Sequence, residues 1–259
     1  MSLTMQAEAV TRLPRGPHKL LREEVLENQR ERILLAVVSA VGTSGYGNTT
    51  ISEITARAHV SRDAFYEQFA GKEHCFLAAY DRITQTLLDD LIAVGNSHSS
   101  WIEGVRGAAQ TIVRFWRERP DMVRFWMFEI FALGSDGLHH RARALGRFER
   151  LLEAGAERAK TEQQGLPQVP SVIHHATVVS TLELVSQWIL ADGASEPYDL
   201  EETLLYLWLM DIAGHEVASL ALSSTAGRRV APDAAGEPRS RTARQRSSRH
   251  NGSGGRKSS

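Results

Sequence analysis

The chain has 259 residues, a formal net charge of −1 and a single cysteine, Cys75. No apolar run approaches the ~18 residues that a membrane-spanning helix needs, and the first residues lack the apolar segment of a secretory signal, so we expect a cytoplasmic protein. One cysteine excludes a disulfide framework and the paired spacing of a zinc site, and Cys75 is expected to be a small core residue.

Positive charge is concentrated at the two ends of the chain. Residues 1–22 are predicted to form a flexible basic leader, and residues 223–259, rich in Arg, Ser and Gly, a disordered tail. Arg12 and Arg15 of the leader either enter a DNA minor groove, as basic arms do, or only improve solubility. The tail has the same two alternatives, general attraction to phosphate or solvated disorder. The middle of the chain is acidic.

The first predicted elements are three helices. Apolar residues at helical spacing predict a helix over 23–44. Thr50 and Glu53 have the spacing of a capping box and open a second, short helix. After a tight turn, Ser61 caps a third helix. Two short helices joined in this way form a helix-turn-helix, in which the second helix enters the major groove of DNA.

The run from Arg32 to Lys72 resembles the N-terminal domain of the TetR (tetracycline-repressor) family of bacterial regulators. The positions in register are Gly45, Tyr46, Thr49, Thr50, Ile54, Ala58, Val60, Ser61, Phe65, Tyr66, Phe69, Lys72 and Glu73. One position departs, because His59 stands in the turn where the family usually has Gly. Histidine is enriched among residues that adopt left-handed backbone, so we expect the turn to be kept at a small cost.

The resemblance implies an all-α fold. A helix-turn-helix DNA-binding domain of three helices (23–71) is joined by a long helix to a larger helical domain for ligand binding and dimerisation (72–222). Beyond Lys72 the apolar spacing predicts only helices, and no period-two strand pattern competes. The predicted ranges are 72–94, 101–118, 121–133, 136–159, 171–191 and 200–222.

The outward face of the two short helices supplies the predicted DNA contacts. Arg62 lies in the first turn after its cap and is expected to touch a base edge or, equally, a phosphate. Tyr66 matches the phosphate-contacting tyrosine of the family, and Asp63 either accepts from cytosine or favours the helix start. The full predicted set is Thr50, Ser61, Arg62, Asp63, Ala64, Tyr66 and Lys72.

Aromatic residues cluster before and within the predicted helix 121–133. An aromatic group between helices can enclose a largely apolar effector, although such stripes are more often ordinary core. The predicted pocket residues are Trp116, Phe125, Phe128 and Phe131; Trp126 belongs to the same cluster. The adjacent histidine pairs 139–140 and 174–175 point ~100° apart on a helix and do not suit one ion, so no metal or cofactor is expected.

The last two predicted helices carry more apolar surface than one face of a monomer needs. We expect a homodimer through them; the alternative is an internal helix pair. The predicted interface residues are Val179, Leu182, Val185, Leu205, Trp208 and Ile212, and Asp211 and His215 are expected to pair at the seam. A two-fold dimer sets its reading helices ~34–36 Å apart and requires a roughly palindromic operator.

The sequence contains no phosphate-binding glycine loop, nucleophile elbow or metalloprotease motif, so an enzyme is not expected. The favoured function is a dimeric transcriptional regulator, usually a repressor in this family, with double-stranded DNA and a small apolar effector as its partners. The alternative is a helical ligand-binding or assembly protein whose helix-turn-helix makes protein contacts. The outward Arg62, Tyr66 and Lys72 argue against that alternative.

Overall fold

The computed structural model describes residues 22–191 and 198–229, without the side chains of Pro120 and 224–229. Within this part of the chain every regular element is helical, which confirms the predicted all-α class. The predicted leader, apart from Arg22, and the tail beyond Arg229 lie outside the described residues.

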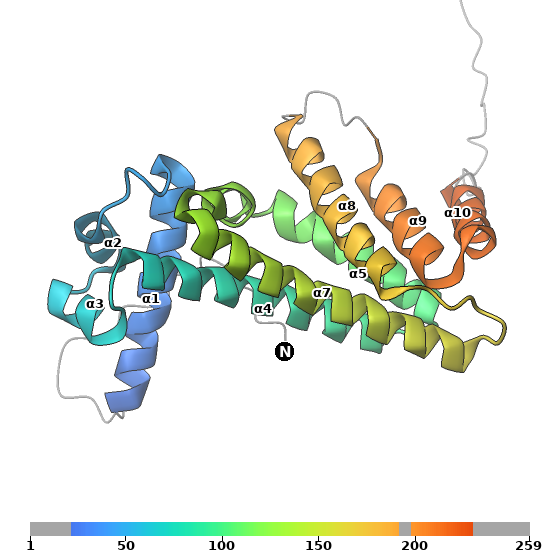
Figure 1. Ribbon diagram of the computed structural model, residues 1–259, viewed down its shortest axis with the longest axis horizontal. Coiled ribbons are helices and arrows are strands. Elements are labelled where there is room, and N and C mark those ends of the chain that lie inside the picture. The colour runs from blue at the N-terminus through green and yellow to red at the C-terminus, as the bar shows by residue number, and fades with distance from the viewer. Residues whose placement is uncertain (1–21, 192–197, 230–259) are drawn as a thin grey trace, which may run out of the picture.

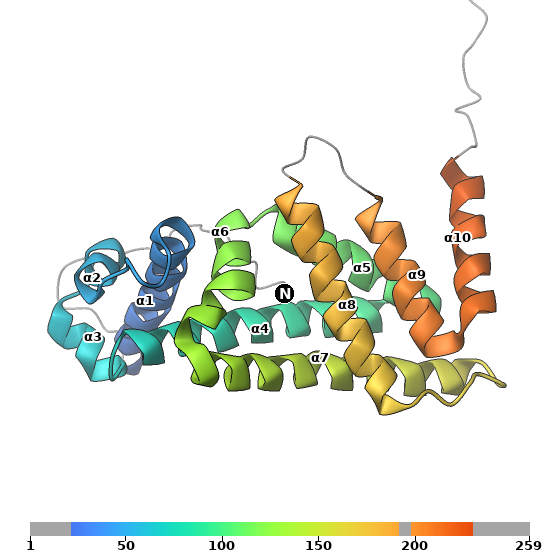
Figure 2. The same cartoon turned by 45° about the horizontal axis from the view of Figure 1, so that its top comes forward.

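Three helices make a small unit at one end of the molecule (Figure 1): α1 (Arg22–Ser44), α2 (Ile51–Ala58) and α3 (Arg62–Gln68). Helix α4 (Lys72–Ser97) leaves this unit and runs through the larger part, beside α7 (Gly134–Glu162) and in the same direction (Figures 1 and 2). The remaining helices are α5 (Trp101–Arg117), α6 (Pro120–Val123), α8 (Ser171–Leu190), α9 (Leu200–Ala213) and α10 (His215–Arg229). Helix α4 therefore physically joins the two parts.

Local capping explains where α2 and α3 begin. The Thr50 hydroxyl accepts from the backbone N–H of Glu53 at 3.2 Å, and the Ser61 hydroxyl accepts from that of Ala64 at 3.0 Å. The predicted capping box is only half formed, because the Glu53 carboxylate accepts from Arg57 at 2.9 Å instead of turning back to Thr50. Each hydroxyl still satisfies one of the amide donors that a helix start leaves free.

The turn between α2 and α3 is held by His59. Its φ of 53° and ψ of 46° lie in the left-handed region, as expected from the sequence. The Arg32 guanidinium on α1 donates to the carbonyl of Ala58 at 3.1 Å, so α1 also fixes the end of α2. Ile54, Phe65 and Phe69 are buried beneath the turn and lock both short helices onto α1.

Cys75 lies at the start of α4 in this core. Burial raises the pKa of its thiol to about 12, partly opposed by the charge of Arg30. The thiol therefore stays protonated and inert at neutral pH, which agrees with its predicted role as a small core residue.

Two predicted helices differ from the observed ones. The range 121–133 is not one α-helix: α6 is followed by a π-helical turn, η1 (Arg124–Phe128), and a 3₁₀ turn, η2 (Glu129–Leu133). Phe125, Trp126 and Met127 are all buried, a run of consecutive inward residues that one amphipathic α-helical face does not provide. The range 200–222 is broken at Gly214, whose φ of 87° ends α9, and α10 continues seven residues beyond the predicted boundary at 222.

Candidate nucleic-acid interface and apolar cavity

The surface of α3 carries exposed polar side chains. Ser61, Arg62, Asp63 and Tyr66 are exposed, while Ala64 is half-buried. Tyr66 is 49% exposed, and its ring packs edge-on against that of Phe65 with centroids 5.5 Å apart. Because Phe65 fills the core below it, the Tyr66 hydroxyl is left outside, where it can donate to a phosphate. The predicted α3 residues therefore form one continuous outward surface.

Lys72, predicted to contact a phosphate, makes two hydrogen bonds within the protein. Its Nζ donates to the carbonyls of Tyr46 at 2.7 Å and Thr49 at 2.9 Å, and lies 4.1 Å from the centre of the Tyr46 ring. An ammonium has three N–H donors, so one remains for an outside acceptor. The main role that the geometry gives Lys72 is to clamp the start of α4 to the loop before α2.

A carboxylate joins this loop to the larger part of the molecule. Glu129, in η2, accepts from the backbone N–H of Tyr46 through Oε2 at 2.7 Å, and Arg124 donates to its Oε1 at 3.2 Å. Close by, α1 and α6 touch through their backbones, since a Cβ built on Gly42 would lie 2.6 Å from the carbonyl oxygen of Asp121. The η1–η2 segment is thus in direct contact with the helix-turn-helix unit.

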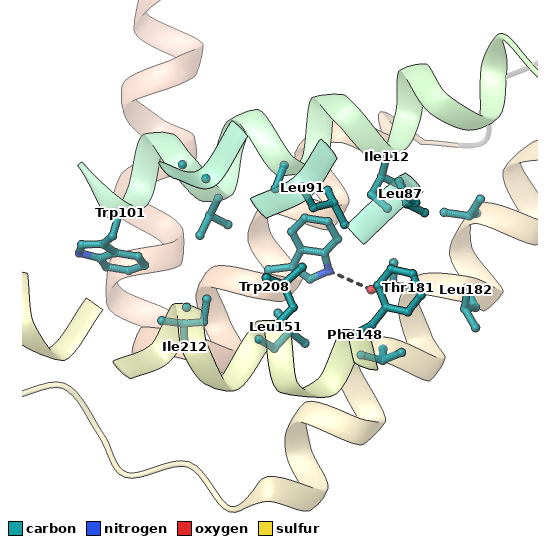
Figure 3. A pocket seen from close by; sticks show the side chains of 18 of the residues that line it. Leu87, Leu91, Trp101, Ile112, Phe148, Leu151, Thr181, Leu182, Trp208 and Ile212 are labelled. Carbon is teal, nitrogen blue, oxygen red and sulfur yellow. Dashed lines mark hydrogen bonds between the residues drawn. The ribbon is translucent and has the colours of Figure 1, made fainter. Parts of the chain in front are cut away.

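The larger part encloses an apolar cavity of about 150 Å³ (Figure 3). Its walls come from α4, α5, η1, α7, α8 and α9, and are almost entirely aliphatic or aromatic. The Trp208 indole N–H donates to the Thr181 hydroxyl at 2.8 Å, and that hydroxyl donates to the carbonyl of Thr177 at 2.8 Å. These polar groups of the wall are therefore already paired.

Arg158 is the charged residue at the cavity wall, and each of its three nitrogens donates one hydrogen bond within the protein. It donates to the carbonyls of Gly95 at 2.6 Å and His98 at 2.8 Å, and to Glu162 at 2.8 Å. Glu162 in turn accepts from the backbone N–H of Trp101 at 2.9 Å. The hydrogen bonds from Arg158 and from Trp101 lower the pKa of the Glu162 carboxyl. Arg158 therefore pins the α4–α5 turn to the end of α7 and offers little to a ligand.

The cavity and the predicted aromatic pocket share few residues. Of the four predicted residues only Trp116 lines it. Phe125 packs on Phe76, with ring centroids 4.3 Å apart, while Phe128 and Phe131 point to solvent on η1 and η2. The reason is the π and 3₁₀ winding, which turns these side chains away from the positions that an α-helix would give them. Trp126, which belongs to the same aromatic cluster of the sequence, also lines the cavity. The prediction missed Phe148, for which the helical spacing of Phe148, Leu151 and Gly155 was the available signal.

Most residues of the predicted dimer interface lie inside the single chain. Leu182, Val185, Trp208 and Ile212 line the cavity, and Leu205 is fully buried within the single chain. Only Val179 of the predicted set is exposed. Helices α8 and α9 are apolar on two faces, and the prediction selected residues of the inner one. The exposed apolar residues of these helices are Val172, Ile173, Val179, Leu190 and Met210.

The expected Asp211–His215 pair does not form. Asp211 is buried and pairs with His174 of α8, Nδ1 to Oδ2 at 3.0 Å, while the Tyr206 hydroxyl bonds to His215 at 2.7 Å. The break at Gly214 puts His215 on another helix, which removes the i to i+4 geometry. Among the described residues, no group of three or more His, Cys, Asp and Glu side chains could hold a metal ion.

The family model described as "Bacterial regulatory proteins, tetR family" matches residues 33–79, from α1 through the helix-turn-helix into α4. Residues 33–79 therefore form a TetR-type DNA-binding domain. A domain of this kind is a DNA-binding domain of bacterial regulators, in which the second helix of the helix-turn-helix, here α3, is the one that enters the major groove. No helix in the described ranges is long and apolar enough to cross a membrane.

Solved structures of the same fold cover most of this chain. The fatty acid degradation regulator FadR from Bacillus halodurans is 16% identical, with a TM-score of 0.62 over 71% of this chain and 98% of its own. FadR from Bacillus subtilis, solved in complex with stearoyl-CoA, is 14% identical, with a TM-score of 0.61 over the same shares. A TetR-family regulator from Marinobacter aquaeolei VT8 is 23% identical, with a TM-score of 0.56 over 78% of this chain and 98% of its own. No curated protein matches the chain by sequence.

Proposed function

We propose that this protein is a homodimeric repressor of the TetR family that acts in the cytoplasm and leaves a roughly palindromic operator when an apolar effector enters its cavity. The observation that carries the proposal is the apolar cavity in the larger part, walled partly by the segment that touches the helix-turn-helix. Residues 23–71 would form the DNA-binding domain, and residues 72–222 the domain for effector and partner.

The operator contacts are assigned to the exposed side of α3. Arg62 and Tyr66 are exposed there, and among the described residues no carboxylate forms an ion pair with Arg62. A free guanidinium at the first turn of the reading helix can make the bidentate contact to guanine or hold a phosphate. Thr50, Ser61 and Asp63 are exposed as well, Ala64 is half-buried, and Lys72 contributes its one remaining donor.

The effector is assigned to the class of apolar acyl groups. The cavity wall presents no unpaired charge, so an ionised group inside it would lose its hydration without compensation. An apolar cavity of about 150 Å³ takes a ligand of roughly benzene size. A longer chain would therefore have to displace side chains such as Phe148 and Leu182. The acyl-CoA bound by the Bacillus subtilis structure supports this class of ligand.

The route from cavity to reading helix is short. Trp126 lines the cavity, donates its indole N–H to Thr84 of α4 at 2.9 Å and stacks on Tyr80, with ring centroids 5.1 Å apart. Three residues later, Glu129 holds the loop before α2. An effector that displaces Trp126 would move α4 and the η1–η2 segment together, and thereby change the spacing of two reading helices.

The homodimer is assigned to the outer face of α8 and α9. Val172, Val179 and Met210 are exposed there, whereas the inner faces of α8 and α9 are already buried around the cavity. Burying such side chains between two copies is favourable by roughly 25 cal/mol per Å² of apolar surface. The effector and the partner subunit would then use opposite faces of the same two helices.

DNA binding is tested by fluorescence anisotropy on DNA from upstream of the protein's own gene, over a range of salt concentrations. Arg62→Ala and Tyr66→Phe should each weaken binding about tenfold, corresponding to ~1.4 kcal/mol, without lowering the melting temperature. Arg114→Ala, an exposed arginine on α5, is the matched control and should bind as the wild type does. If the wild type and all three variants bind the DNA with equal affinity, the assignment of α3 as the reading surface is wrong.

The effector site is tested with Gly155→Leu. Gly155 lines the cavity inside α7, and a Cβ there meets only the end of Ile212 at 3.7 Å. Leucine should fill the cavity while raising the helix propensity by up to ~1 kcal/mol. We expect the variant to bind operator DNA with normal affinity. Palmitoyl-CoA should no longer release it from that DNA. Gly146→Ala, on the same helix outside the cavity, should still be released. Release of Gly155→Leu by the acyl ligand would contradict the assignment.

A further inference from the structure

A second hollow, of about 820 Å³, lies between α1, α4 and α7. It uses different faces of α4 and α7 from the apolar cavity: Arg147 and Arg150 face the hollow, whereas Phe148 and Leu151 face the cavity. Figures 1 and 2 show α4 and α7 side by side, with α1 crossing near their beginnings. The hollow, which we call the arginine groove, therefore lies where the helix-turn-helix unit meets the larger part.

The arginine groove is rich in positive charge. Its lining includes five arginines, against three carboxylates: Arg30, Arg82, Arg143, Arg147 and Arg150 against Glu27, Glu31 and Asp81. Of these five, only Arg82 forms an ion pair with a carboxylate within the described residues, to Glu31 at 3.2 Å. A concave surface lined mainly by one sign of charge concentrates ions of the opposite sign.

The other groove arginines have neutral partners or none. Arg30 stacks over the Phe69 ring at 4.7 Å, Arg143 donates to His140 at 2.7 Å, and Arg147 donates to the side-chain carbonyl of Gln85. His140 accepts from Arg143 through Nδ1 and so carries its proton on Nε2, which donates to Asp81 at 2.9 Å. His140 thereby occupies the Asp81 carboxylate as well. Four guanidinium charges remain without a carboxylate in the described part of the chain.

Three of these arginines form one stripe on α7. Positions 143, 147 and 150 are spaced i, i+4 and i+7, so their side chains lie above one another on a single helix face. Like charges at this spacing destabilise a helix. An anion bound across the stripe would remove this repulsion. Planar guanidinium groups are also suited to bidentate contacts with phosphate oxygens.

We propose that the arginine groove binds a ligand that carries two or more linked phosphate groups. The ligand bridges Arg30 on α1 and the arginine stripe on α7. Because one wall belongs to the helix-turn-helix unit, occupancy of the groove favours one position of α1 relative to α7. Polyphosphate binding is therefore coupled to DNA binding, by a factor that is the same in both directions. This inference does not depend on the apolar effector.

The test is isothermal titration of the full chain with inorganic pyrophosphate and with ADP, at constant ionic strength. The wild type should bind pyrophosphate, and more weakly as salt increases. The double variant Arg147→Ala/Arg150→Ala should bind at least tenfold more weakly, while the control Arg114→Ala is unchanged. Similar affinity for pyrophosphate and ADP identifies a site for phosphate alone, whereas ADP binding at least tenfold tighter identifies a nucleotide-type ligand.

Several results would overturn the proposal. The first is that neither pyrophosphate nor ADP binds at about 10 mM, a concentration that would occupy even a weak anion site. The second is that Arg114→Ala loses as much pyrophosphate affinity as the double variant. The third is that the double variant loses operator affinity without added phosphate. The last result would assign the arginines to the DNA backbone instead. Arg147→Lys/Arg150→Lys keeps the charges if the alanine variant does not fold, and should retain weakened pyrophosphate binding. Gly155→Leu should bind pyrophosphate normally, so a failure of the effector assignment is distinguishable.

Discussion

Glu129→Ala removes the carboxylate that joins the helix-turn-helix unit to the larger part of the protein. Glu129 is 15% exposed and accepts from the Tyr46 backbone N–H at 2.7 Å. A hydrogen bond to a charged group contributes ~1.5–3 kcal/mol, and the N–H left behind has no other acceptor. The pair with Arg124 adds little, because that arginine is half exposed. We therefore expect a loss of about 2–3 kcal/mol in the free energy of unfolding.

The assay is thermal and urea unfolding followed by circular dichroism. For a chain of this size about 1 kcal/mol lowers the melting temperature by ~2–4 °C, so Glu129→Ala should melt roughly 4–12 °C below the wild type. Glu129→Gln keeps an acceptor for the Tyr46 N–H without the charge, so its melting temperature should lie between those of the wild type and Glu129→Ala. Glu157→Ala, which removes a 73% exposed carboxylate paired with Lys160, should stay within about 0.5 kcal/mol of the wild type. The reasoning is refuted if Glu129→Ala is as stable as Glu157→Ala.

Three further variants or probes test single features. Cys75, whose pKa is raised to about 12 by burial, should not react with Ellman's reagent at pH 8 until urea unfolds the chain; rapid labelling of the native protein would contradict this. Gly42→Ala places a methyl 2.6 Å from the Asp121 carbonyl oxygen and should cost about 1–3 kcal/mol in urea unfolding; no change would mean that α1 and α6 yield freely. His59→Gly should be at least as stable as the wild type by calorimetry, and His59→Val less stable by more than ~1 kcal/mol; the reverse order would exclude strain at the turn.

The helix-turn-helix could be predicted because its signals are local. A hydroxyl at Thr50 or Ser61 caps the helix that directly follows it, and histidine at position 59 is a residue type that tolerates the left-handed backbone of the turn. The face of α3 that is exposed follows from the burial of Phe65 and Phe69 within the same few residues. The predicted DNA contacts at Arg62 and Tyr66 rest on these local facts and still await a test on DNA.

The cavity could not be predicted because it depends on packing between distant helices. From the sequence, Trp208 and Ile212 are apolar residues of α9 with no assigned partner within the chain. In the structure they face the cavity, because α5, α7 and α8 pack on that side of α9. Phe128 and Phe131 belong to an aromatic cluster of the sequence, but both are exposed on the π and 3₁₀ turns, which the expected α-helix over 121–133 did not include. Likewise Asp211 has a local candidate in His215, yet its partner is His174, 37 positions earlier.

The π-helical turn Arg124–Phe128 has a consequence for how movement passes through the protein. A π turn holds one residue more than an α-helical turn, so moving it along the chain by one position rotates the side chains that it passes by roughly 100°. Trp126 lies inside the turn, and Glu129 begins the next. The backbone hydrogen bonds of such a segment close in one register or the other. The junction is therefore suited to a discrete change of register rather than to gradual bending.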